Sequence, residues 1–138
     1  MAELIGRFSG QTFAILRIIA GLMFAMHGTQ KLLGYPPMPK EMSGPLPLIG
    51  KVGGGIEMIC GLLMAIGLFA GIAAFVASGE MAVAYFTVHA QSAFWPIENK
   101  GELAVLYCFV WLFVAAHGAG IWSIDSVIRR RTPVVTTA

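Results

Sequence analysis

Four long apolar runs, separated by polar or proline-rich stretches, divide the chain. They predict helices at about residues 11–33, 47–69, 72–91 and 102–119. Each run has close to the roughly 20 residues that a helix needs to cross the ~30 Å hydrocarbon core of a bilayer. A segment in lipid must satisfy its backbone hydrogen bonds internally, and a helix does so. The pattern therefore predicts an all-α integral membrane protein, a bundle of four transmembrane helices in a single domain, residues 1–138.

The last part of the chain predicts a helix of another kind. Residues 123–130 place Ile124, Val127 and Ile128 on one helical face, next to a run of three arginines at 129–131. An apolar face beside a basic cluster is typical of a helix that lies at the membrane–water interface. We therefore expect a short C-terminal interfacial helix after the fourth span.

Composition and charge support a membrane location. Hydrophobic residues make up 57% of the chain and charged residues only 12%, whereas a soluble domain has about 25% charged residues. The basic residues form no stripe suited to nucleic acid, so no nucleic-acid partner is expected. Four spans would put both termini on one side of the membrane. The arginines at 7 and 129–131 favour the cytoplasm for that side.

Three charged residues lie inside the apolar runs: Arg17, Glu57 and Glu80, each in a different predicted helix. Counted from the helix ends at about 1.5 Å per residue, all three fall near mid-membrane. A charge in hydrocarbon is costly unless another group compensates it, so we expect these residues to form one buried charge cluster. Such a cluster either only fixes how the helices align, or is a protonatable or ligand-binding centre. The sequence leaves both interpretations open.

A second polar layer lies near the helix ends on the side of the two long loops. It includes His27, Lys31, His89 and Glu102. One interpretation is ordinary polarity at the level of the lipid headgroups. The other is a site for a polar or quinone-like head group under the proline-rich loop, where histidine would suit proton transfer near neutral pH. The two cysteines have no metal-binding spacing, and no metal is expected.

The ordered set of motifs resembles the DoxX family of small four-helix bacterial membrane proteins. The matching pieces are Leu16-Arg17, residues 21–24, the run His-Gly-Thr-Gln-Lys-Leu at 27–32, residues 55–57 and 61–63, Glu80 leading to His89, Phe-Trp-Pro at 94–96, residues 99–103 and residues 122–125. The resemblance covers about residues 12–126. It implies a bacterial inner-membrane protein tied to redox processes. Members of this family occur as the membrane subunit of thiosulfate:quinone oxidoreductases, and others are associated with oxidative-stress and sulfur redox complexes.

The leading hypothesis is therefore a small membrane subunit that supports quinone-linked redox chemistry, at most as one part of a membrane oxidoreductase. A quinone is the one cofactor that this hypothesis needs. Its partners would be the lipid bilayer, a membrane or peripheral redox protein, and a second copy of the chain. Two alternatives stay open: a scaffold subunit that docks a partner and binds no ligand, and a conduit for protons or small solutes.

Overall fold

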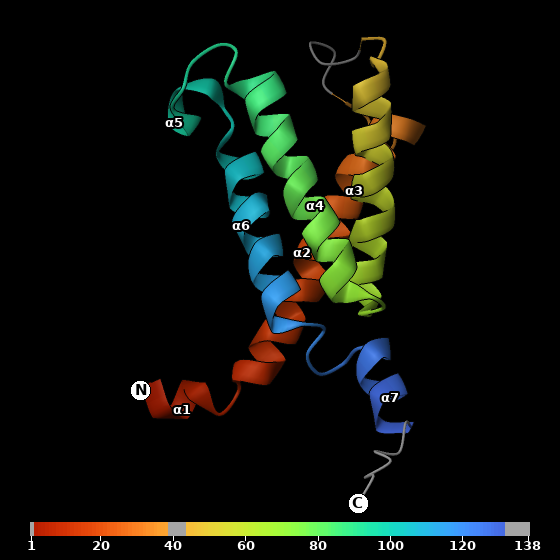
Figure 1. Cartoon of the computed structure of the whole chain (residues 1–138), viewed down its shortest axis with the longest axis vertical. Helices are drawn as coiled ribbons and strands as arrows, with labels where there is room; N and C mark the ends of the chain where they lie inside the picture. The colour runs from red at the N-terminus through yellow and green to blue at the C-terminus, as the bar shows by residue number, and fades with distance from the viewer. Residues whose placement is uncertain (1, 39–43, 132–138) are drawn as a thin grey trace, which may run out of the picture.

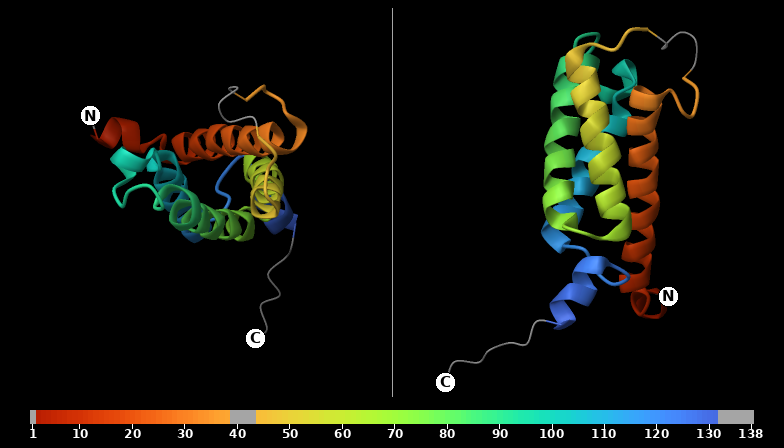
Figure 2. Two further views of the ribbon diagram at one scale, coloured as in Figure 1. Left: turned by 90° about the horizontal axis from the view of Figure 1, so that it is seen from above. Right: turned by 90° about the vertical axis from the view of Figure 1, so that its right-hand side faces the viewer.

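The computed structural model describes residues 2–38 and 44–131, and its regular elements in these ranges are helices, with no strand among them. The four main helices stand side by side (Figures 1 and 2). They are α2 (Ser9–Leu33), α3 (Leu48–Ile66), α4 (Ala70–Ala84) and α6 (Glu102–His117). A π-helical turn, η2 (Tyr85–His89), prolongs α4. Three short helices complete the fold: α1 (Ala2–Gly6), α5 (Pro96–Asn99) and α7 (Ile124–Arg131).

Along the chain, each main helix packs against the next: α2 on α3, α3 on α4, and α4 on α6. The long loop after α2 and the segment that holds α5 lie at one end of the bundle (Figure 1). Helices α1 and α7, which lie nearest the two termini, are at the opposite end. Successive main helices therefore run in opposite directions.

The contact between α2 and α3 brings their backbones together. A Cβ atom added to Gly28 would lie 2.4 Å from Met58 N and 2.5 Å from Gly54 O. One added to Gly61 would lie 2.5 Å from Ala25 N. These distances are shorter than any van der Waals contact, so only glycine fits at these positions. Small residues at helix contacts are a known way to pack helices in membranes, where burial of apolar surface drives association less.

Large aromatic side chains fill the space between α2 and α6. The ring of Phe24 lies 5.1 Å from that of Tyr107 and 5.3 Å from that of Trp111, measured between centroids. Trp111 is completely buried. Across the bundle, α4 meets α6 through buried alanines, and Ser78 Oγ donates a hydrogen bond to the Cys108 carbonyl oxygen at 2.8 Å. The aromatic side chains thus join the α2–α3 pair to the α4–α6 pair.

The helix boundaries agree closely with the predicted ones, except where α3 meets α4. Helix α3 ends at Ile66 and α4 begins at Ala70, because Gly67 and Phe69 both adopt left-handed backbone angles, with φ of +71° and +49°. The short helices α1 and α5 lie in stretches that we expected to be irregular. Helix α5 begins at Pro96, whose fixed φ and missing N–H suit the first turn of a helix.

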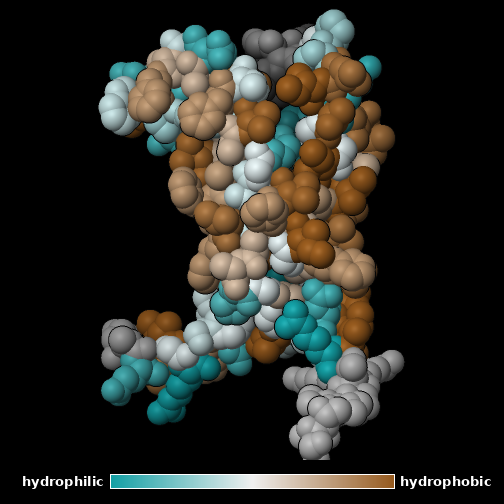
Figure 3. Space-filling model, in the orientation of Figure 1, coloured by the Kyte–Doolittle hydropathy of each residue, from teal (hydrophilic) through white to brown (hydrophobic). Residues whose placement is uncertain are grey.

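Among the described residues, three helices are long and apolar enough to cross a membrane: α2, α3, and α4 together with η2. Helix α6 is equally apolar but has 16 residues, fewer than the roughly 20 that span a bilayer core. On the face that Figure 3 shows, hydrophobic side chains predominate in the middle, and most hydrophilic ones lie towards the two ends. The surface therefore has the layered polarity of a membrane protein, while a fourth span stays a prediction.

Replacing Gly28 with alanine tests the α2–α3 contact. The added methyl group would overlap the backbone of α3, and overpacking of this kind typically costs about 1–3 kcal/mol. We expect Gly28→Ala to lower the melting temperature in detergent, measured by differential scanning fluorimetry. Gly79→Ala is the matched control, because its Cβ would meet nothing within 4 Å. Equal melting temperatures for the two variants would contradict the close contact.

Candidate functional site

Lys31 and Glu57 form an ion pair between the last turn of α2 and the middle of α3. Lys31 Nζ lies 2.6 Å from Glu57 Oε1. The Glu57 side chain is 3% exposed, and that of Lys31 is 33% exposed. Lys31 passes close to Gly54: a Cβ atom added to Gly54 would lie 3.0 Å from the Cβ atom of Lys31. Glu57 Oε2 has no hydrogen-bond partner among the described residues, so half of this buried carboxylate is left unsatisfied.

Glu80 of α4 brings a second carboxylate to the same place. Its Oε1 lies beside Gly53, where an added Cβ would be only 2.9 Å away. Glu80 is close enough to interact electrostatically with Glu57, which repels it, and with Lys31, which attracts it. Its Oε2 is buried and has no hydrogen-bond partner within residues 2–38 and 44–131. Two carboxyl groups therefore share one ammonium group.

A cavity of about 350 Å³ opens between α3 and α4 beside these charges. Lys31, Glu80 and Thr87 are the polar side chains that line it. The rest of its wall is apolar, formed mainly by Ile49, Val52, Ile56, Val76, Val83 and Val88. Most of these apolar side chains are exposed on the outside of the bundle. The cavity is thus a mostly apolar slot that opens on the hydrophobic outer surface of the bundle and has Lys31 and Glu80 in its wall.

Lys31 also lines a second cavity, of about 590 Å³, on the loop side of the ion pair. Gln30 and Lys51 line it as well, together with the described ends of the loop between α2 and α3. Lys51 is exposed and Lys31 is partly exposed. The Lys31 side chain therefore stands between a polar cavity near the helix ends and the apolar slot deeper in the bundle.

Arg17 is completely buried, and its partners are backbone carbonyl groups. Its Nη1 donates to the carbonyl oxygen of Met64 and, at 3.0 Å, to that of Ala65, both in the last turn of α3. Its Nη2 donates to the carbonyl oxygens of Ile121 at 3.4 Å and Trp122 at 2.8 Å. The last carbonyl groups of a helix lack partners within that helix and carry partial negative charge, so a guanidinium group suits this position.

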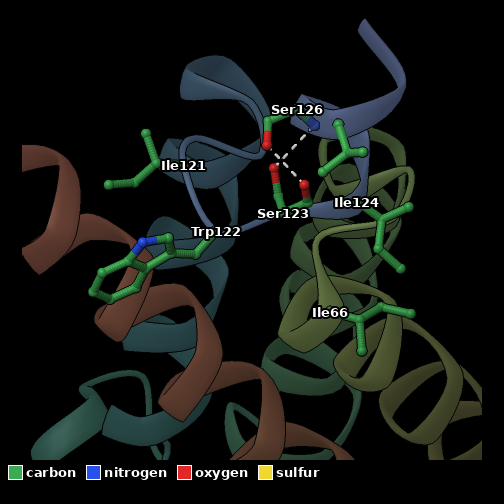
Figure 4. Close-up of a pocket in the computed structure, with 7 residues that line it drawn as sticks. Ile66, Ile121, Trp122, Ser123, Ile124 and Ser126 are labelled. Carbon is green, nitrogen blue, oxygen red and sulfur yellow. Dashed lines mark hydrogen bonds between the residues drawn. The ribbon is translucent and has the colours of Figure 1, made fainter. Parts of the chain in front are cut away.

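Asp125 and Ser123 complete the same contact region, which we call the α7 clasp: Arg17, Gly67, Ser123 and Asp125. The Asp125 carboxylate accepts hydrogen bonds from the backbone N–H groups of Phe69 and Ala70 at 3.0 and 3.1 Å, at the start of α4. Its own N–H donates to the Gly67 carbonyl oxygen at 2.9 Å. Ser123 Oγ accepts from the N–H of Ser126 at 3.2 Å (Figure 4). The clasp thus ties the start of α7 to the turn between α3 and α4.

The structure does not bring Arg17 together with Glu57 and Glu80, and the expected cluster of three charges is corrected in that respect. Arg17 and Lys31 are 14 residues apart on α2, or about 21 Å. Lys31 is near the end of α2 that leads into the long loop, and Glu57 lies nine residues after the start of α3. The two meet because α3 begins further towards the loop end of the bundle than the point where α2 ends (Figure 2). In the sequence, we measured the depth of each charge from its own helix end and assumed that all helix ends lie at the same height. For this reason we wrongly paired Arg17 with Glu57 and Glu80.

The other predicted residues have separate surroundings. The His27 ring packs edge-on against Tyr107, with centroids 6.3 Å apart. The His89 ring stacks on Tyr85, and its Nδ1 lies 3.2 Å from the Asn99 carbonyl oxygen. Glu102 is exposed in the first turn of α6. None of these three lines either cavity of Lys31 in the described structure. Their part in binding a ligand stays a prediction.

Sequence reasoning did not find the roles of Gly53 and Asp125. Gly53 was one of several glycines in the second apolar run, and nothing in the pattern shows that it makes room for Glu80. Asp125 follows Ser123 at the start of a helix, where acidic residues are common. Its actual partners are backbone N–H groups more than 50 residues away, and such donors have no sequence signature.

Comparison with known proteins gives a family and two relatives. The family model described as DoxX matches residues 12–90. One similar protein, from Haemophilus influenzae, is 41% identical over 120 residues, which cover 82% of this chain and 87% of that protein. A second protein of the same organism is 26% identical over 134 residues, or 91% of this chain and 88% of its own length. Both are described only as uncharacterized proteins. No solved structure matches.

Removing the Arg17 guanidinium tests the α7 clasp. In Arg17→Gln the short amide side chain cannot reach both α3 and residues 121–122, so their buried carbonyl groups lose donors. We expect faster backbone hydrogen exchange in residues 121–127, measured by mass spectrometry in detergent, and a similar effect in Asp125→Asn. Arg7→Gln is the control, because Arg7 is exposed. Unchanged exchange in both clasp variants would show that α7 is held by other contacts.

Proposed function

Because this chain belongs to the DoxX family, we propose that it is a membrane subunit that binds a quinone-like head group and supports quinone-linked redox chemistry. The observation that carries the proposal is the slot between α3 and α4. Its wall is apolar apart from Lys31, Glu80 and Thr87, and it opens on the hydrophobic outer surface of the bundle, which would face lipid. Electrons would come from a partner redox protein, and this subunit would supply the binding site for the carrier.

The slot matches what a quinone requires of a protein. A quinone has a flat apolar ring, two carbonyl oxygens that accept hydrogen bonds, and often a long apolar tail that stays in lipid. The Lys31 ammonium group can donate to one carbonyl oxygen, and Glu80 can donate to it when its carboxyl group is protonated. The volume of about 350 Å³ lies within the range of small-molecule sites. The tail would leave between Val52 and Val83, which are exposed.

The proposed setting is the bacterial inner membrane, with α2, α3, the α4–η2 helix and α6 as the spans. Helices α1 and α7 lie at one end of the bundle, and Arg7, directly after α1, together with the arginines of α7 favours the cytoplasm for that end (Figure 1). Helix α7 would lie along that surface with its apolar face towards the lipid. The slot and the polar cavity would then lie nearer the other face of the membrane.

Binding of a short-chain benzoquinone to the purified protein in lipid nanodiscs tests this proposal. Val52→Trp places a large ring in the slot, and we expect it to weaken binding at least tenfold, equal to about 1.4 kcal/mol. Ile59→Trp is the matched control, since both residues are on α3 and are 55% and 57% exposed, but Ile59 does not line the slot. Lys31→Met removes the main donor and should also weaken binding.

Two outcomes would count against the proposal. Equal effects of Val52→Trp and Ile59→Trp would place any quinone elsewhere, and the polar layer of His27 and Glu102 would then be examined by His27→Ala and Glu102→Gln. No measurable binding in any lipid composition would overturn the quinone function. A scaffold subunit that docks a partner without a ligand would then be the better explanation.

A further inference from the structure

We infer that Glu57 and Glu80 hold one shared proton, which lies mainly on Glu80 and exchanges with water past Lys31. The inference goes beyond quinone binding and does not depend on it, because every charge that it involves belongs to this chain. The site would then bind a proton in addition to the proposed quinone.

The count of charges requires this proton. With both carboxyl groups ionised, Glu57, Glu80 and Lys31 together would carry a net charge of −1 inside an apolar bundle. Glu57 is only 2% exposed, and an uncompensated charge at such a position is costly. Binding one proton makes the three side chains neutral overall. Because the two carboxyl groups interact, the binding of this proton is described for the pair and not for either residue alone.

No neighbouring group in the described structure replaces the proton. Besides Lys31 from α2, Cys60 of α3 interacts with Glu80, and Tyr107 of α6 interacts with Glu57. Neither a thiol nor a phenol supplies a positive charge. Arg17 donates to carbonyl groups near the other end of α2. Lys31 is therefore the cation that faces the pair within the described residues.

Within the pair, the contacts place the proton on Glu80. The Lys31 ammonium group touches Glu57 Oε1 at 2.6 Å. The Oε2 atoms of Glu57 and Glu80 are both buried without a partner in the part of the chain that the structure describes, so the contact with Lys31 is what favours the ionised form at Glu57 and the protonated form at Glu80. A proton from water would form one O–H bond there and leave by the reverse step, with no other bond made or broken.

The position of Lys31 provides the route for exchange. Its side chain lines both the polar cavity near the helix ends and the slot that contains Glu80. It is 33% exposed, and water in the cavity near the helix ends would reach it. Movement of this flexible side chain away from Glu57 would open the way between the two cavities.

Infrared spectroscopy of the quinone-free protein in lipid tests the inference, because the carbonyl stretch of a protonated carboxyl group is distinct from that of a carboxylate. At neutral pH we expect one such band, which shifts after transfer to D2O. Glu80→Gln should lose the band, because Lys31 then balances Glu57. Glu57→Gln should lose it too, because Lys31 then balances Glu80. Lys31→Met should roughly double its intensity, because two carboxyl groups are then without a cation.

Two further variants make the test specific. Glu98→Gln removes an exposed carboxyl group and should leave the band unchanged. Gly53→Ala pushes on Glu80 Oε1 without changing any charge, and it should shift the band and not remove it. The inference is overturned if the original protein lacks the band, if the band survives in both Glu57→Gln and Glu80→Gln, or if sodium ions abolish it, which would indicate a bound cation. A band that fails to shift in D2O would rule out the route past Lys31.

Discussion

The close contact between the backbones of α2 and α3 determines where the charged groups of these two helices, Arg17, Lys31 and Glu57, lie relative to their partners. Gly28 and Gly61 allow an approach that no side chain could permit, and so they fix how far one helix is shifted along the other. That shift places Lys31 against Glu57 near one end of the contact and Arg17 against the last turn of α3 near the other. The small residues that let α2 and α3 pack closely therefore also bring each of these charged groups to its partner.

The two ends of this contact compensate charge in opposite ways. Both Nη atoms of Arg17 donate to neutral carbonyl groups, from α3 and from residues 121–122, and Asp125 is a nearby negative charge. Its buried Nε has no partner among the described residues. Its contacts join three segments, which is a structural role. Near the other end, two carboxyl groups meet one lysine, and two carboxyl oxygens have no partner among the described residues. An arrangement with unsatisfied groups beside a cavity is poorly explained by stability alone and is typical of a binding site.

The slot between α3 and α4 gives this arrangement a chemical use. Its wall is mostly apolar and opens on the hydrophobic outer surface of the bundle, while Lys31 also lines the cavity near the helix ends. A lipid-soluble carbonyl compound and a proton would thus reach the same few atoms from different sides. Reduction of a quinone consumes protons as well as electrons, so the proposed quinone and the proposed proton would serve one reaction. The α7 clasp lies at the far end and keeps the basic helix apart from this chemistry.

The sequence alone determined the helices, their approximate ends, and which residues are unusual. Long apolar runs have few alternatives to helices, and a charge within such a run needs a partner, so Arg17, Glu57 and Glu80 stood out. Which partner each one finds was decided only by the tertiary structure. The sequence of a helix carries no direct record of its shift along a neighbour, and an error of a few residues in that shift moves a charge by several ångströms. Carbonyl and N–H groups, the partners of Arg17 and Asp125, are present at almost every residue, so no pattern of side chains could have revealed them.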